Sequence, residues 1–159
     1  MEMKLGFCEL KGETGHTAGR RLLAELYEAE TGLSLPEIAT TPRGKPYFVD
    51  SSWHFSITHT RHYAFCAFSQ TPIGIDAEEL DRDIDLRLAE KMLSPSEFAR
   101  YEQAENKRLA LLTFWVLKEA QAKFTGEGLH GYPDKNTDFS LTDSRVYTQN
   151  NCLLAIIEE

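Results

Sequence analysis

Two nine-residue stretches of the chain resemble each other. Phe55 to Tyr63 reads FSITHTRHY and Phe139 to Tyr147 reads FSLTDSRVY, with a cysteine shortly downstream of each. A leucine-rich segment with helical spacing precedes both stretches. The repetition predicts two related halves of mixed α+β structure, each with a helix followed by a pair of strands. Coincidence, or hairpin chemistry shared by two unrelated turns, remains the alternative explanation.

The size of the chain limits it to one folded unit. Its 159 residues, 42% of them apolar, fill one core but not two independent ones. No linker or low-complexity segment divides it. We therefore expect a single unit over residues 1–159, with an N-terminal half at 1–72 and a C-terminal half at 73–159. The charge-dense stretch from Leu80 to Glu105 is expected to be solvated helix surface.

Local patterns place the secondary structure within these halves. Period-two and period-3.6 apolar spacings separate the strands from the helices, and glycine, proline and capping residues mark their ends. The expected order is a strand at 3–10, a helix ending at Gly32, a loop from Thr40 to Pro46, a strand at 47–49, two strands within 54–69, a strand at 73–78, a helix capped by Ser94 and Glu97, a helix from Asn106 to Phe124 ended by Gly126 and Gly128, and two or three strands in 138–159.

Charge and apolar content restrict the partners. The net charge of −8 argues against broad binding to nucleic acid or to an anionic membrane, since both require a basic face. No apolar run approaches the roughly 20 residues that cross a bilayer, and the first residues lack a secretory pattern. Cys8, Cys66 and Cys152 are widely spaced, which favours reduced core thiols. These features predict a cytoplasmic protein.

A basic cluster stands out in this acidic chain as a candidate anion site, although a solvated surface is the more common meaning of such a cluster. It consists of Arg43, Lys45, His59, Arg61 and His62.

Carboxylates at two positions indicate a divalent-cation site. Asp76 and Glu78 are two apart on a predicted strand, so both side chains lie on one face. Trp115, Glu119 and Lys123 follow each other at four-residue spacing along one side of the long helix. If strand and helix pack together, three acids and a lysine converge, a set that suits Mg²⁺ and a diphosphate. Solvated surface acids and an ordinary helix ion pair are the alternatives.

Four motifs in order resemble one family. They are R-G-K-P at 43–46, F-S-I-T-H-T at 55–60, T-P-I-G-I-D-A-E at 71–78 and F-W-V-L-K-E-A-Q-A-K at 114–123. Together they are similar to the signatures of the 4′-phosphopantetheinyl transferase superfamily, in its larger, pseudo-dimeric type that activates surfactin synthetase. The resemblance covers roughly residues 16 to 129. It implies two similar α+β halves about a pseudo-twofold axis, with coenzyme A in the cleft between them.

The resemblance also implies roles for individual residues. Asp76, Glu78 and Glu119 would hold Mg²⁺ against the coenzyme A diphosphate, and Lys123 would contact that diphosphate. The remaining coenzyme A contacts would be Lys45 and Pro46 beside the adenine and 3′-phosphate, Thr58 and His59 at the nucleotide phosphates, and His16 at the 3′-phosphate. Ser56, Thr58 and Thr60 stand where the family usually has Asn and Ser, which keeps hydroxyl groups near the phosphates.

The implied reaction is transfer of the phosphopantetheine arm to a serine of an apo acyl or peptidyl carrier protein. The serine hydroxyl attacks the β-phosphorus of coenzyme A, and 3′,5′-ADP leaves. Glu119, directly or through a metal-bound water, is the expected general base, and Lys123 stabilises the leaving group. Two halves in one chain predict a monomer.

Two other functions use the same residues. A metal-dependent phosphodiesterase or nuclease also needs acids and a lysine, but the chain lacks a basic nucleic-acid face. A non-catalytic nucleotide- or partner-binding module would keep the fold, yet it would have no need for all three acids and Lys123.

Overall fold

The protein consists of two helix-on-sheet halves placed side by side. The computed structural model describes residues 3–127 and 133–159. The first half contains β1 (Lys4–Glu9), α1 (Gly15–Thr31), β2 (Ile38–Thr40), β3 (Pro46–Phe48), β4 (His54–His59) and β5 (Tyr63–Ser69). The second contains β6 (Ile73–Glu79), α2 (Leu88–Met92), α3 (Pro95–Gln103), α4 (Lys107–Thr125), β7 (Val146–Gln149) and β8 (Cys152–Glu158). The predicted mixed α+β class is confirmed.

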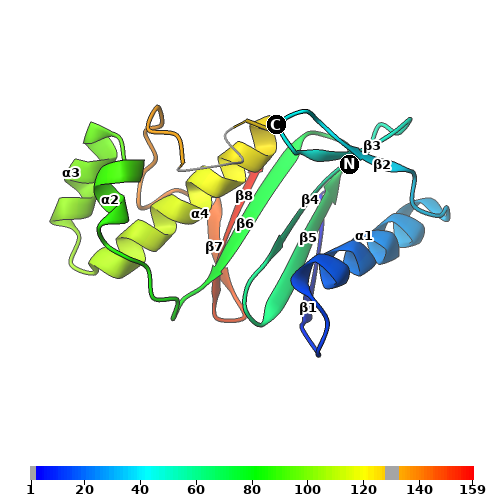
Figure 1. Ribbon diagram of the computed structural model, residues 1–159, viewed down its shortest axis with the longest axis horizontal. Helices are drawn as coiled ribbons and strands as arrows, with labels where there is room; N and C mark the ends of the chain where they lie inside the picture. The colour runs from blue at the N-terminus through cyan, green and yellow to red at the C-terminus, as the bar shows by residue number, and fades with distance from the viewer. Residues whose placement is uncertain (1–2, 128–132) are drawn as a thin grey trace.

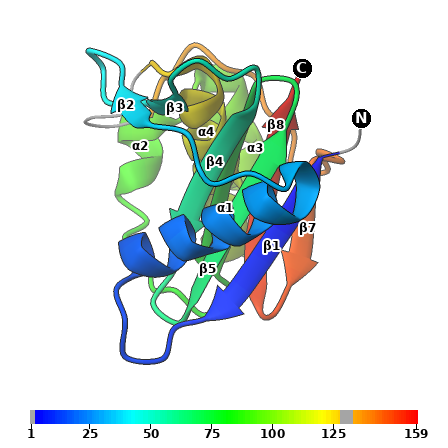
Figure 2. The same cartoon turned by 90° about the vertical axis from the view of Figure 1, so that its right-hand side faces the viewer.

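The main sheets have the same plan in both halves. One is ordered β1-β5-β4 and the other β6-β8-β7, and all their neighbouring strands are antiparallel. In each half a strand comes first, a long helix follows, and two strands joined by a turn complete the sheet. Figure 1 shows α4 lying along one sheet and α1 along the other, and Figure 2 shows α1 from its solvent side. This shared order agrees with two related halves, while the exact boundary and the pseudo-twofold axis stay predictions.

The repeat that led to this expectation, however, does not match equivalent strands. Phe55 to His59 lies in β4, whereas residues 139–145 precede β7 and form turns and irregular backbone. By sheet order, β4 corresponds to β7 and β5 to β8. The predicted alignment of the two nonapeptides is therefore wrong, because it pairs Tyr63, which begins β5, with Tyr147, which lies in β7.

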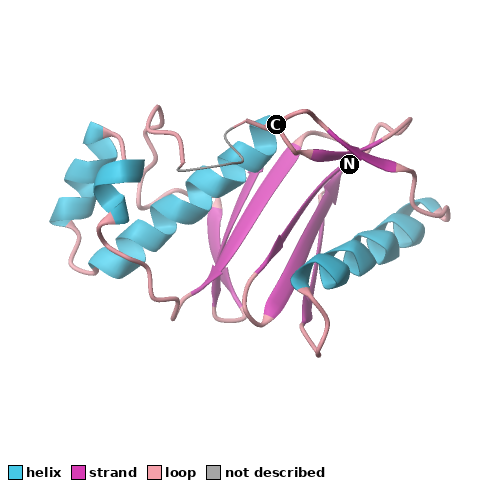
Figure 3. Ribbon diagram, in the orientation of Figure 1, coloured by secondary structure: helices cyan, strands magenta, loops and turns pink. Residues whose placement is uncertain are grey.

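Three apolar clusters hold the layers together. One packs α4 and the segment of α2 and α3 on the β6-β8-β7 sheet, and a second packs α1 on the β1-β5-β4 sheet. The third joins β5, β6 and β8, with Phe65, Ile75 and Leu154 among its members. The strands thus lie between the two long helices, as Figure 3 shows by element type.

Capping residues end the helices where the sequence predicts. Ser94 and Glu97 form a reciprocal capping box on α3, and Asn106 caps α4. Gly32 and Gly126 end α1 and α4 in the left-handed conformation that favours glycine. Gly128, the other predicted helix stop, lies outside the described residues.

The charge-dense stretch from Leu80 to Glu105 exposes most of its charged side chains, as the sequence predicts, but it also contributes residues to the core. Met92 and Glu97 are fully buried in it, and Leu93 is nearly so. The Glu97 carboxylate lies 2.7 Å from Lys118 Nζ, and it also accepts hydrogen bonds from Thr137 Oγ1 and the Phe139 amide. Burial alone would raise the pKa of Glu97, but these partners outweigh it and lower the pKa. A charged residue is therefore tolerated in the core because its partners come from distant segments.

The three cysteines agree with the predicted free thiols in or beside the core. Cys66 and Cys152 are buried, Cys8 is half-buried, and all three are free. Within the described residues, no helix combines the length and apolar character needed to cross a bilayer.

Candidate active site

The two halves meet at β4 and β6, which lie side by side without a backbone ladder between them. The amide of Ile75 donates to Ser56 Oγ at 3.0 Å, and the amide of Ala77 donates to Thr58 Oγ1 at 3.3 Å. Side-chain hydroxyls of β4 therefore satisfy backbone donors of β6. Ser56 and Thr58, two of the three hydroxyl residues predicted near the phosphates, thus also join the two halves at the seam between β4 and β6.

A glycine brings α4 close to β6. A Cβ at Gly74 would lie 2.2 Å from the Ala120 carbonyl oxygen and 2.3 Å from the Phe124 amide nitrogen. Only glycine permits this approach. Gly74, Asp76 and Glu78 alternate along the same face of the strand, so the short separation places both acids beside α4.

Asp76 is the centre of the site. Its Oδ1 accepts hydrogen bonds from Lys123 Nζ at 3.1 Å and from Thr58 Oγ1 at 3.2 Å. Its Oδ2 is buried and has no hydrogen-bond partner in the described residues. Burial raises the pKa of Asp76, while Lys123 and Thr58 oppose that shift. An orphaned buried carboxylate oxygen is the feature expected of a ligand position for a cation.

Glu78 and Glu119 complete an acidic cluster around Asp76. Burial, together with the charge of Asp76, raises the pKa of Glu78 to about 7. The same two causes raise the pKa of Glu119, and Lys123 opposes them. Because the charge of Asp76 raises the pKa of both Glu78 and Glu119, the three predicted metal residues interact electrostatically.

The cluster is not arranged as a finished metal site. In residues 3–127 and 133–159, no group of three or more acidic, histidine or cysteine side chains is close enough to enclose an ion. Lys123 occupies one oxygen of Asp76, and Arg82 Nη1 lies 2.5 Å from Glu78 Oε1. These cations partly balance carboxylates that otherwise repel each other. The donor set and the orphaned Asp76 oxygen fit Mg²⁺.

A pocket of about 220 Å³ lies beside Lys123, and we call it the Lys45 pocket. It is lined by Gly44, Lys45, Pro46, Phe55, Ser56, Ile57 and Lys123. Lys45 Nζ donates to the Phe124 carbonyl at 2.7 Å, so the loop before β3 is tied to the end of α4. Burial lowers the pKa of Lys45. The structure thus brings Lys45, Pro46 and Lys123 together, from both halves of the chain.

His59 and His16 lie on the α1 side of β4. A Cβ at Gly15 would be 2.1 Å from the His59 ring, so the ring lies directly against the first turn of α1. His16 is the next residue in that turn and is exposed. Both predicted phosphate contacts are therefore close in space, although no hydrogen bond joins them to each other.

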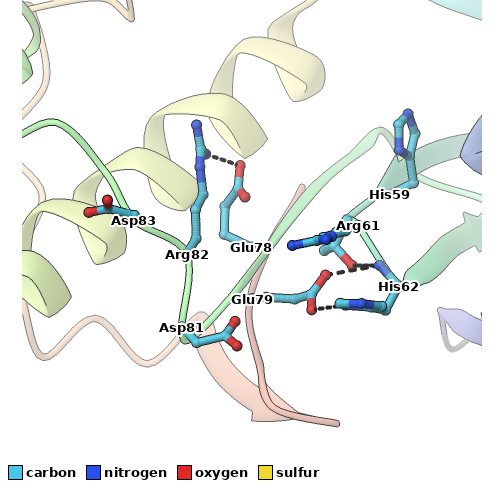
Figure 4. A pocket seen from close by; sticks show the side chains of 9 residues that line it. His59, Arg61, His62, Glu78, Glu79, Asp81, Arg82 and Asp83 are labelled. Atoms are coloured by element: carbon cyan, nitrogen blue, oxygen red, sulfur yellow. Dashed lines mark hydrogen bonds and ion pairs between the residues drawn. The ribbon is translucent and has the colours of Figure 1, made fainter.

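A second pocket, of about 620 Å³, opens at the far end of β6, and we call it the Arg82 pocket. It is lined by His59, Thr60, Arg61, His62, Glu78, Glu79, Asp81, Arg82 and Asp83 (Figure 4). Glu79 holds one wall in place, since its carboxylate accepts from the His62 amide at 2.9 Å and faces His62 Nδ1 at 2.5 Å. Burial would raise the pKa of Glu79, but its hydrogen bonds with His62 and Thr60 lower it.

Sequence reasoning missed Arg82. It lies within a mostly acidic stretch, and its distance of four residues from Glu78 has no meaning on a strand that ends at Glu79. Only the turn of the chain after β6 shows that its guanidinium returns to Glu78.

The fold and the site define a class: an α+β protein of two helix-on-sheet halves with a partly buried cluster of acids and a lysine where they meet. Comparison with known families makes this specific. The family model of the 4′-phosphopantetheinyl transferase superfamily matches residues 72–156, a little over half of the chain. The chain belongs to this superfamily.

Curated relatives carry the same description. The 4′-phosphopantetheinyl transferase gsp of Aneurinibacillus migulanus is 33% identical over 114 residues, covering 67% of this chain and 46% of the relative. The 4′-phosphopantetheinyl transferase psf-1 of Bacillus pumilus is 32% identical over 120 residues, covering 72% and 49%. Sfp of Bacillus subtilis is 32% identical over 94 residues, covering 57% and 42%. The chain spans about half the length of the curated relatives it matches.

Proposed function

We propose that the protein is a Mg²⁺-dependent 4′-phosphopantetheinyl transferase that moves the arm of coenzyme A to a serine of an apo acyl or peptidyl carrier protein. The observation that carries this proposal is the meeting of Asp76, Glu78, Glu119 and Lys123 beside the Lys45 pocket. Superfamily membership supports the identity of the donor.

The residues divide the work of binding coenzyme A. Lys45 and Pro46 border the adenine and its 3′-phosphate in the Lys45 pocket. His59 and His16 stand at the first turn of α1, where exposed imidazoles and helix amides favour an anion. Thr58 acts indirectly, since its hydroxyl orients Asp76. Asp76, Glu78 and Glu119 would hold Mg²⁺, which neutralises charge on the diphosphate when bound.

The chemical step is a displacement at the β-phosphorus. The carrier serine oxygen forms a bond to this phosphorus, and the bond from it to the bridging oxygen breaks. The electron pair leaves on 3′,5′-ADP, and Lys123 stabilises that negative charge. Glu119 takes the serine proton, because its raised pKa suits a base that works near neutral pH.

The cellular compartment and the oligomeric state can be proposed from the cysteines and from the Lys45 pocket. We propose that the protein acts in the cytoplasm, because its cysteines are free and buried or half-buried. We also propose that it is a monomer, because the Lys45 pocket already contains residues of both halves.

The test is incubation with coenzyme A, Mg²⁺ and several apo carrier proteins, read by intact mass. We expect a phosphopantetheine adduct on at least one carrier, none on the same carrier with its serine changed to alanine, and none when EDTA replaces Mg²⁺. A folded sample that modifies no carrier would refute the proposal.

A further inference from the structure

Two cations accompany the acids in a fixed order along β6. Lys123 is bound to Asp76, and Arg82 is bound to Glu78, two residues further along the strand. Two residues of a strand span about 6.6 Å. Lys123 also lines the Lys45 pocket, and Arg82 lines the Arg82 pocket at the opposite end. The positive charges are therefore staggered between the two pockets.

Arg82 is held in place by contacts from α4. Arg108 donates to the carbonyl oxygens of Leu80 and Arg82, which fixes the chain after β6. The Arg82 guanidinium lies 5.3 Å from the centre of the Trp115 ring. In Figure 4 the Arg82 and Glu78 side chains extend side by side, with His59 on the other side of the opening. These contacts restrict the conformations of the Arg82 side chain, so that its guanidinium is preorganised to bind a ligand.

The guanidinium retains donors for a ligand. Its Nη1 donates to Glu78, and neither Nε nor Nη2 makes a hydrogen bond to any residue in the described part of the chain. On the other wall of the pocket, His62 is committed to Glu79, while His59 and Arg61 also line the opening. Arg82 can hold Glu78 and bind a phosphate oxygen at once, because its five N–H groups form a planar fork.

The orientation of coenzyme A then assigns the two phosphates, an argument that rests on the proposed function. With the nucleotide in the Lys45 pocket, the α-phosphate, which stays on the nucleotide, lies nearer to Lys123. The β-phosphate, which leaves with the arm, lies further toward Arg82. We propose that Arg82 is a catalytic residue that binds the β-phosphate, the group that is transferred.

This assignment gives Arg82 a role distinct from that of Lys123. While the serine oxygen bonds to the β-phosphorus and the bridging oxygen departs with its electron pair on 3′,5′-ADP, the non-bridging β-oxygens remain anionic. Arginine stays protonated throughout, so it stabilises them without exchanging a proton. Lys123 acts on the leaving side, and Glu119 receives the serine proton. Arginines commonly stabilise transferred phosphoryl groups in this way.

The test compares two ligands by calorimetry, since 3′,5′-ADP lacks the β-phosphate. Arg82→Gln is expected to weaken coenzyme A binding at least about tenfold and to change 3′,5′-ADP binding less than about twofold. Lys123→Ala is expected to weaken both ligands. Arg87→Gln, which removes an exposed arginine paired with Asp85, is the matched charge control and should change neither.

If Arg82 acted only by positioning Glu78, the calorimetry would depend on Mg²⁺ in a different way. In that case the loss would require Mg²⁺ and disappear in EDTA, whereas a direct phosphate contact persists in EDTA. If Arg82→Gln does not fold, Arg82→Lys keeps the charge without the fork and is expected to show a smaller loss for coenzyme A alone. Equal effects on both ligands, or none, would overturn the proposal. Failure of the wild-type protein to modify a carrier concerns the proposed function instead.

Discussion

The acid cluster contains more acidic than basic side chains. Asp76, Glu78 and Glu119 face Lys123 and Arg82, and the pKa of each acid is raised, first by burial. Burial in the metal-free fold therefore disfavours the charged form of these acids. Sites of this kind are often kept for binding at a cost in stability.

The raised pKa of Glu78 predicts that the metal-free protein is more stable at low pH than at neutral pH. A carboxyl with a folded-state pKa of about 7, against an ordinary value of 4.5, contributes full stability below pH 4.5 and loses it as the pH rises to 7. Replacing the acid by glutamine removes this loss. In EDTA, the stability of Glu78→Gln relative to wild type should rise by about 1–2 kcal/mol between pH 4.5 and 7.5, as urea unfolding would measure. Parallel pH curves for the two proteins would contradict the expectation.

The proposed role of Glu119 as general base predicts a loss in turnover. Glu119→Gln keeps the shape of the side chain but cannot accept the serine proton, so kcat should fall by about 10²–10⁴ at saturating Mg²⁺. Coenzyme A binding should change much less. Glu28→Gln, on the exposed face of α1, is the matched control and should retain full turnover. Full activity of Glu119→Gln would remove the residue from the mechanism.

Among the elements, the contact between α4 and β6 determines the geometry of the site. Gly74 faces two backbone atoms of α4, which cannot turn aside as a side-chain tip can. A methyl group there must push the helix away from the strand that bears Asp76.

Gly74→Ala is therefore expected to destabilise the protein by about 1–3 kcal/mol in urea unfolding and to lower transfer activity. Gly6→Ala in β1 is the control, because its Cβ would meet the tip of Leu26 at 3.3 Å. Gly6→Ala should lower the free energy of unfolding clearly less than Gly74→Ala does. A stable, fully active Gly74→Ala variant would show that the close approach is not needed.

Prediction from sequence succeeds for elements whose signals are local and fails where the partner is distant. The capping box at Ser94 and the stop at Gly126 could be identified because each depends on a few neighbouring residues. The three-residue strand β2 was missed within a segment without alternation. The burial of Glu97 could not be predicted, because Lys118 reaches it only after α3 packs on α4.

The site follows the same division. The two-residue and four-residue spacings place Asp76 with Glu78, and Glu119 with Lys123, on single faces. Their meeting depends on Gly74, and the role of Ser56 and Thr58 in the seam depends on two strands from different halves. Arg82 depends on the turn after β6 and was therefore not visible in any local pattern.

In the molecule as a whole, the Lys45 pocket and the Arg82 pocket are each lined by residues of both halves. The Lys45 pocket takes Lys45 and Ile57 from the first half and Lys123 from the second. The third apolar cluster continues this connection through β5, β6 and β8. A ligand in the seam should therefore stabilise both halves together.

The protein is thus expected to unfold in a single transition, and coenzyme A is expected to raise the Tm of that transition. At a concentration 100 times its Kd it adds about 2.7 kcal/mol to the free energy of unfolding. For a chain of this size that shift corresponds to a rise in Tm of about 5–10 °C. Tryptophan fluorescence can follow each half, since Trp53 packs in the α1 cluster and Trp115 beside the α4 cluster. Trp53→Phe and Trp115→Phe variants should each give one transition, which shifts when coenzyme A is added at 100 times that variant's own Kd. Separate transitions, only one of which responds to the ligand, would mean that the halves unfold independently and that coenzyme A binds to one of them.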